Sequence, residues 1–289
     1  MRISPEGIVQ DSVFIEKPGS AETANDVIVT SDGDIITIGS TTDIDASDGT
    51  SALDFFDIYS IRLSQTFIPF TTSAGVGDNF WRRVSGSPST DIGESLVQND
   101  NGNYIFLATT NRDPEDNSGK EGFNIYTSEV GFDGEAISES DVISGTTNNE
   151  SASKIIKTET GFSILGFTEN GNSDEIYLVR LGSSGARLDE GNLSLGTNVS
   201  SSSISESRTG GLLIAGSSTT NLNSDIYMAR ITLTGQLIWE NTFGGLDNDE
   251  GKEILELPDG SVVILGTVEL ESQTKIALIK TNSENELKP

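Results

Sequence analysis

Short apolar runs alternate along this chain with turns rich in glycine, aspartate and serine, and the alternation repeats. Residues 204–245 and 254–281 present the same succession of a strand-like run, a glycine turn, a hydrophobic run and a further strand. The hydrophobic runs end at Gly39, Ala108, Gly166, Gly216 and Gly266. The last three are 50 residues apart, a period that is typical of a propeller, a solenoid or another repeat array.

Each repeat contains four runs of strand-like composition, rich in Ile, Val, Leu and Tyr, and no run has the 3.6-residue apolar period of a helix. In the fourth repeat the runs are Ser201–Glu206, Leu212–Ala215, Ile226–Ile231 and Leu237–Thr242. Turn pairs that favour positive φ join first to second strands, at Asp32-Gly33, Asn101-Gly102 and Asp259-Gly260. The pattern predicts an all-β fold, a five-bladed β-propeller of four-stranded antiparallel blades.

We expect one propeller domain over residues 1–289, in which the N-terminal strand completes the last blade. The last repeat stops at its third strand, Lys275–Lys280, while Gly7–Gly19 resembles the outer-strand phrase Gly235–Gly245. Val13–Lys17 is therefore predicted to close the ring and to cover an otherwise open sheet edge. The expected blades cover about 21–84, 90–144, 149–196, 199–244, and 249–281 with 8–18.

The composition limits the chemistry of the chain. Neither cysteine nor histidine occurs, which excludes disulfides, thiolate or imidazole metal sites, and catalysis by either residue. Any metal would be bound by oxygen, and calcium is the first candidate. The formal net charge of −28 disfavours nucleic acids and anionic membranes. It is typical of a soluble surface outside the cell, with adaptation to high salt and cation binding as alternatives.

The aromatic residues follow the repeat. Trp81, Trp239 and Phe14 occupy one outer-strand position, and Tyr59, Tyr126, Tyr177 and Tyr227 occupy another. An aromatic residue that recurs at the same position of several units is most simply explained by packing between blades. Few aromatics then remain to stack on a glycan.

Function is expected in the insertions, because they depart from the repeat. Residues 40–56 and 109–122 lengthen the loop between second and third strands in the first two blades, so they should neighbour each other on one face. Both are acidic. The side chains that we expect to contact a partner are Asp48, Phe55, Phe56, Asp113, Glu115 and Asp116, together with Phe67 and Phe70 from a third insertion, residues 64–80, on the opposite face. The apolar third insertion either folds back on its blade or forms a contact patch.

The first insertion also resembles a calcium loop. Asp43, Asp45, Ser47 and Asp54 fall at positions 1, 3, 5 and 12, but Asp48 stands where such a loop requires glycine. The candidate ligands are these four oxygen donors. The alternative is a solvated turn cluster without metal, and no other cofactor is expected.

Further acids lie on the inner strands and on the links between blades, including Glu94, Asp91, Glu150 and Asp249. Paired carboxylates in a propeller channel could hydrolyse glycosidic bonds. Acidic residues are common throughout the chain, however, and the sequence contains no distinctive catalytic constellation. We therefore expect no enzyme activity.

The repeat resembles a known family. Leu257–Thr267, Ser224–Ile231 and Gly235–Gly245 are similar to the propeller-type repeats of bacterial secreted proteins and lipoproteins, especially those of the Bacteroidetes. The resemblance implies a secreted or outer-membrane surface location, with a leader or lipid anchor removed. It implies no shared catalytic residues.

These observations together predict a non-catalytic binding or scaffold module outside the cell. The expected partner is a protein, such as a component of an outer-membrane or secreted assembly. The alternatives are a glycan-binding surface protein assisted by calcium and, third, a glycoside hydrolase. No apolar run is long enough to span a membrane.

Overall fold

The chain is an all-β protein with the fold of a five-bladed β-propeller. A computed structural model describes residues 2–12, 19–42, 56–64, 81–87, 89–112, 119–169, 174–195, 198–270 and 273–282. These residues contain no helix, so none of them forms a helical segment able to cross a membrane. The chain divides into two compact units, Met1–Ile143 and Ser144–Pro289.

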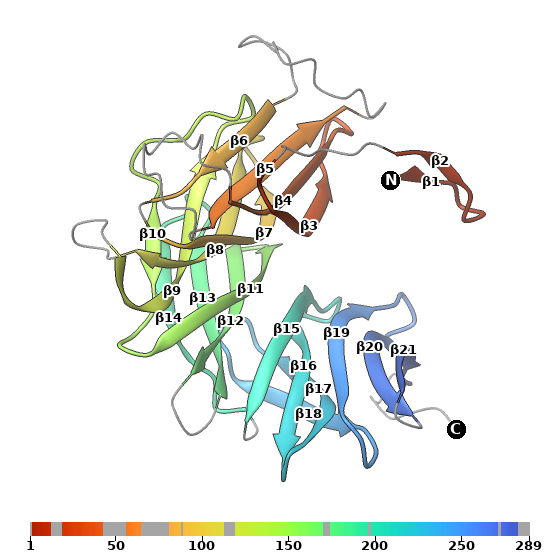
Figure 1. Cartoon of the computed structure of the whole chain (residues 1–289). Helices are drawn as coiled ribbons and strands as arrows, with labels where there is room; N and C mark the ends of the chain where they lie inside the picture. The colour runs from red at the N-terminus through yellow and green to blue at the C-terminus, as the bar shows by residue number, and fades with distance from the viewer. Residues whose placement is uncertain are drawn as a thin grey trace. The chain divides into compact units, whose positions relative to one another are not determined.

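The first two blades are four-stranded antiparallel sheets whose strands pair in chain order (Figure 1). Blade 1 consists of β3 (Glu22–Val29), β4 (Ile35–Thr41), β5 (Asp57–Leu63) and β6 (Trp81–Ser85). Blade 2 consists of β7 (Asp91–Gln98), β8 (Tyr104–Arg112), β9 (Gly119–Val130) and β10 (Val142–Ser144). A short hairpin of β1 (Arg2–Ile3) and β2 (Val9–Asp11) precedes them.

The remaining blades follow the same plan. Blade 3 consists of β11 (Asn149–Thr158), β12 (Gly161–Glu169), β13 (Asp174–Gly182) and β14 (Arg187–Asn192). Blade 4 consists of β15 (Val199–Glu206), β16 (Leu212–Thr220), β17 (Asn223–Ile231) and β18 (Leu237–Phe243). The last blade has three described strands, β19 (Asp249–Glu256), β20 (Val262–Leu270) and β21 (Gln273–Lys280). The expected four runs per repeat are confirmed in blade 4, with longer strands.

The predicted closing strand, Val13–Lys17, lies outside the described residues. Among the residues that are described nearby, Val9–Asp11 pairs with Arg2–Ile3. Closure of the ring by the N-terminal strand therefore stays a prediction.

The repeated glycine at the end of each hydrophobic run faces a β-bulge on the inner strand. All five inner strands shift register at the same position, for example between Ser201 and Ser203 in blade 4 and between Gly93 and Ser95 in blade 2. A Cβ built on Gly216 would lie 1.9 Å from the carbonyl oxygen of Ser200. Blade 2 reverses the arrangement, since Ala108 stands opposite Gly93. The repeated glycine is thus a requirement of backbone packing at the bulge.

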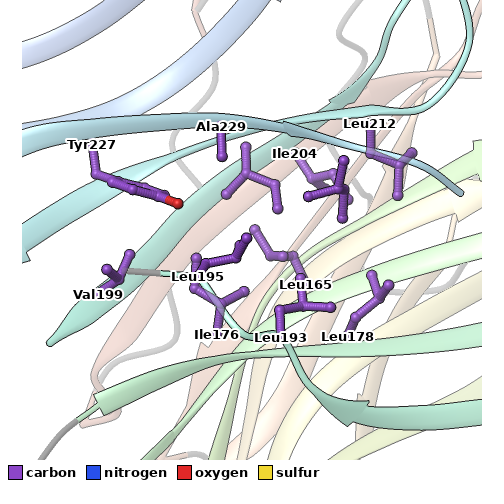
Figure 2. Close-up of a cluster of buried hydrophobic side chains, with 12 residues drawn as sticks. Leu165, Ile176, Leu178, Leu193, Leu195, Val199, Ile204, Leu212, Tyr227 and Ala229 are labelled. Carbon is purple, nitrogen blue, oxygen red and sulfur yellow. The ribbon is translucent and has the colours of Figure 1, made fainter. Parts of the chain in front are cut away.

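Apolar side chains fill the space between neighbouring blades inside each unit. In the first unit Ile36, Ile38 and Ile58 of blade 1 pack against Phe106 and Tyr126 of blade 2. Figure 2 shows the corresponding cluster in the second unit, where blade 3 side chains such as Leu165 and Leu178 face blade 4 side chains such as Leu212 and Ala229. Burial of these side chains supplies the main stabilisation of each pair of blades.

A turn of blade 2 covers the outer strand of blade 1. The carbonyl oxygen of Phe132 accepts hydrogen bonds from Trp81 Nε1 at 3.0 Å and from Arg62 at 2.7 Å, and Arg83 donates to the carbonyl of Gly134 at 2.8 Å. A Cβ on Gly134 would lie 2.7 Å from the Trp81 ring. The prediction that Trp81 serves packing between blades is confirmed.

Candidate functional site

Most of the side chains singled out from the sequence lie outside the described residues. This holds for the proposed calcium ligands Asp43, Asp45, Ser47 and Asp54, and for the proposed contact residues Asp48, Phe55, Phe67, Phe70, Asp113, Glu115 and Asp116. Phe56 is described and is half-buried. Within the described part of the chain, no group of three or more acidic side chains is arranged to hold a metal ion.

The described ends of the two long insertions lie on either side of one link between blades. The backbone N–H of Asp91 donates to the carbonyl of Phe56 at 2.7 Å, at the end of the first insertion. The N–H of Thr90 donates to Oδ1 of Asn111 at 2.8 Å, at the start of the second. The end of the first insertion and the start of the second therefore contact the same link. The expectation that the two loops neighbour each other on one face stays a prediction.

The acids on the links are structural. Asp91 and Asp249 are the first residues of inner strands, and Glu150 is the second residue of β11. All three are buried, and each accepts a hydrogen bond from the backbone N–H four residues earlier. Val199 occupies this position in blade 4 and joins the hydrophobic core with Leu195. We name Asp91, Glu150 and Asp249 the link acids. The sequence pointed to their positions but not to this role.

Blade 2 adds a buried arginine beside its link acid. Arg112 NH2 lies 3.5 Å from Oδ2 of Asp91, and NH1 lies 3.5 Å from Oδ2 of Asp141. The guanidinium carbon is 4.5 Å from the centre of the Tyr126 ring, within the range of a cation–π contact. Burial opposes the charge on Arg112, but Asp91, Tyr126 and Asp141 outweigh it and raise its pKa.

The same burial raises the pKa of Tyr126 to about 12, so its phenol stays protonated at neutral pH. Two neighbouring strands bring Thr110 and Asn124 into register with Asp91, and paired residues on adjacent antiparallel strands point to the same face. Asp91, Arg112, Asn124 and Tyr126 therefore share the face of blade 2 that packs on blade 1.

Four buried polar atoms in this region have no hydrogen-bond partner among the described residues. They are Ser89 Oγ, Asp91 Oδ1, Arg112 Nε and Asn124 Nδ2. All four side chains are at least nine-tenths buried. Buried polar groups in native proteins are nearly always paired, either with other protein groups or with ordered water. We name Ser89, Asp91, Arg112, Asn124, Tyr126 and Asp141 the loop-root cluster.

Sequence reasoning missed Arg112. The repeat nevertheless marks this position as unusual. The strand registers place the uncharged residues Thr220 and Leu270 of blades 4 and 5 at the position that Arg112 occupies in blade 2. Arg112 falls at the start of the second insertion, where the repeat is hardest to align.

A second unusual group, Glu94, lies on the inner strand of blade 2. Glu94 is the extra residue of the bulge between Gly93 and Ser95 and is half-buried. Burial raises its pKa from 4.5 to about 7, and a hydrogen bond with Thr109 only partly offsets this effect. The bulge is held in place by Asn25 of blade 1, whose amide donates to the carbonyl of Gly93 at 2.8 Å. A carboxyl group with this pKa can give or take a proton near neutral pH.

The chain matches no known family, and no curated protein matches it in sequence. Its fold is similar to that of several solved structures. A puromycin hydrolase matches with a TM-score of 0.52 and 11% identity, over 91% of this chain and 38% of that one. A polysaccharide lyase of family 25, an ulvan lyase, matches with a TM-score of 0.52 and 9% identity, over 91% of this chain and 65% of that one. A family 43 β-1,3-galactosidase matches with a TM-score of 0.42.

At these identities the likeness concerns the fold, and the chain spans less than two thirds of the length of the hydrolase and the lyase. It nevertheless overturns one expectation. We predicted a non-catalytic binding or scaffold module because propeller repeats of this kind carry no shared catalytic residues. The fold occurs in a hydrolase and in a lyase. The prediction of a non-catalytic, non-enzymatic module is therefore wrong.

Proposed function

We propose that this protein is an enzyme that cleaves glycosidic bonds in carbohydrate chains, and that Glu94 is its proton donor. The observation that carries the proposal is a half-buried carboxyl group whose pKa is raised to about 7 on a bulged inner strand. Cleavage by hydrolysis requires a carboxylic acid that is still protonated near neutral pH and can protonate the leaving oxygen.

The surroundings of Glu94 suit this role. The bulge removes its backbone from the regular ladder, and bulges frequently re-aim a side chain next to active sites. The backbone at Gly93 packs directly against blade 1, because a Cβ on Gly93 would lie 2.4 Å from the carbonyl oxygen of Gly39. The bulge therefore has no room to shift toward blade 1. The carboxyl group is therefore held by a rigid strand rather than by a loop. The likeness of the fold to a polysaccharide lyase supports a carbohydrate substrate.

Turnover of a polysaccharide panel tests the proposal. Neutral, uronic-acid-containing and sulfated polysaccharides would be incubated with the protein, and new reducing ends would be counted. The ultraviolet absorbance of unsaturated uronides would separate elimination from hydrolysis. Glu94→Gln should lower turnover by about 100-fold or more, because it removes the proton donor. Glu159→Gln, at an exposed turn, is the matched control and should leave turnover unchanged. If Glu94→Gln turned over substrate at the wild-type rate, Glu94 would be excluded as the proton donor.

We further propose that the enzyme acts outside the cell, as a secreted or surface protein of the Bacteroidetes-type family whose repeats it resembles. Support comes from the net charge of −28, which is typical of a soluble surface outside the cell. A protein partner in a secreted or outer-membrane assembly is compatible with this location. Fractionation of the native organism, with an antibody against the chain, would test it.

Calcium binding by Asp43, Asp45, Ser47 and Asp54 also stays a proposal, supported by their spacing alone. Thermal unfolding with calcium, with magnesium and with chelator would test it. Calcium should raise the unfolding midpoint more than magnesium does, and Asp45→Asn should remove the difference. Equal midpoints in all three conditions would count against calcium.

A further inference from the structure

Three leucines of the second unit are exposed at the same end of blades 4 and 5. Leu222 is 96% exposed, at the tip of the hairpin between β16 and β17, and Leu246 is 98% exposed, on the link between β18 and β19. Leu270, the last residue of β20, is 53% exposed. It lies on the face of blade 5 that packs on blade 4, because Val268, two residues earlier, joins that core. We name Leu222, Leu246 and Leu270 the leucine surface.

Hydrogen bonds between flanking residues bring the three leucines together. The side-chain amide of Asn223 donates to the carbonyl of Gly245 at 3.2 Å, so the residue after the first leucine is bonded to the residue before the second. The N–H of Glu269, just before the third leucine, donates to the carbonyl of Asn248 on the same link at 3.2 Å. The hairpin, the link and the end of β20 therefore form one connected surface.

The backbone of Leu222 adopts a conformation that a leucine side chain disfavours. Its φ is +67° and that of Asn221 is +51°, so both central residues of the hairpin turn are left-handed. Such a turn prefers Asn-Gly, and a leucine at the second position is strained. Because the side chain is 96% exposed, packing within the chain does not offset the strain. A contact with another molecule would offset it.

The surroundings of the leucine surface are acidic. The segments 217–227, 243–251 and 265–270 contain five acidic residues and no lysine or arginine. Lys252, just beyond them, is paired with Glu250 at 2.6 Å. An anionic membrane, or a second copy of this chain with its net charge of −28, would be repelled. A protein segment with apolar side chains between lysines or arginines complements both the leucines and the acids.

We infer that the leucine surface docks a protein partner through an apolar segment that is flanked by lysine or arginine. The apolar side chains of the partner cover the leucines, and its cations lie against the surrounding carboxylates. This surface is separate from the insertions, where the sequence placed the partner contacts. The inference does not rest on the proposed function, because docking requires neither Glu94 nor a carbohydrate.

Fluorescence anisotropy of labelled peptides, titrated with the full chain, measures docking. The probe is a short peptide with leucine and phenylalanine between pairs of lysines. One control peptide has serine at the apolar positions, and the other has glutamate in place of lysine. We expect the probe to bind at least about tenfold more tightly than either control, because each control removes one half of the complementarity.

Two substitutions locate the bound peptide. Leu222→Gly and Leu246→Ser should each weaken binding of the probe by about tenfold, because an apolar contact is lost. Leu222→Gly should leave the unfolding midpoint unchanged or raise it, because glycine adopts positive φ without strain. Leu188→Ser is the matched control, since Leu188 is an exposed leucine on β14 of the same unit. It should leave binding unchanged.

The inference is overturned if both variants bind the probe like the wild type, or if the serine peptide binds as tightly as the probe, which would show attraction by net charge alone. A dimer seen by sedimentation velocity and lost in Leu222→Gly would assign the surface to a second copy instead. Flotation with phosphatidylcholine vesicles that this variant loses would assign it to a lipid surface. Glu94→Gln should bind the probe like the wild type, so failure of docking and failure of the proposed function are separate results.

Discussion

The glycine within the second strand of a blade decides how closely this strand and the inner strand approach at the bulge. Gly216 has no room for a Cβ, whereas a Cβ on Gly191 would meet nothing within 4 Å. We predict that Gly216→Ala lowers the free energy of unfolding by about 1–3 kcal/mol, because the strands must move apart. Urea unfolding measures the loss, and Gly191→Ala should change stability by less than about 0.5 kcal/mol. Equal stability of the two variants would show that the bulge adapts.

Glu94 makes stability depend on pH in a defined window. Its pKa is about 7 in the folded chain and 4.5 in the unfolded one. Between these values the folded state holds a proton that the unfolded state has released, so stability falls as pH rises. Glu94→Gln should remove this part of the slope and be more stable than wild type at pH 8, by an amount of order 1–3 kcal/mol. Chemical unfolding at pH 4.5, 6 and 8 checks this. Parallel curves for the two proteins would contradict the shift.

Single residues were predictable from the sequence where the repeat samples them several times. The tyrosines, the tryptophans and the turn glycines recur at fixed positions, so their structural role could be read from their spacing. Arg112 and Glu94 occur once. Their properties arise from burial against residues that are distant in the sequence, such as Asp91 for Arg112, and no local pattern encodes that burial.

The link acids show how a link between blades is fixed by one side chain. Oδ2 of Asp249 accepts the N–H of Gly245, and Oδ1 accepts the N–H of Glu269. Asp249→Ala leaves the N–H of Gly245 unpaired and leaves the N–H of Glu269 with only the carbonyl of Asn248 as acceptor. We therefore expect a loss of about 1–3 kcal/mol in the free energy of unfolding. Thermal or urea unfolding measures it. The exposed Asp247, on the same link, gives the control, since Asp247→Ala should be nearly neutral.

Strands were the easiest elements to predict. Alternation and turn chemistry are local, so the runs in blade 4 appeared within a few residues of their observed limits. The positive φ of Gly33, Gly102 and Gly260 was predicted for the same reason. The backbone conformation of the insertions could not be predicted, because they interrupt the repeat and have no periodic pattern of their own. The expected face of the two long insertions followed only from the topology of the blade.

For the molecule as a whole, the net charge of −28 makes the stability of the fold depend on salt concentration. Mutual repulsion of the carboxylates disfavours the folded state, and salt screens it. Raising sodium chloride from 0.1 M to 1 M shortens the Debye length from about 10 Å to about 3 Å. We therefore expect the thermal midpoint to rise across this range. A midpoint that falls with salt would indicate that attractive ion pairs dominate.

The turn of blade 2 that covers Trp81 has a consequence for the way the first unit opens. Three side chains of blade 1 donate hydrogen bonds to the backbone of residues 132–134. Strand β6 cannot separate from the sheet until the hydrogen bonds from Trp81 and Arg83 to this turn have also broken. Amide protons of β6 and of the turn should thus exchange with solvent deuterium at a common rate. The smallest part of this unit that unfolds cooperatively is then two blades rather than one.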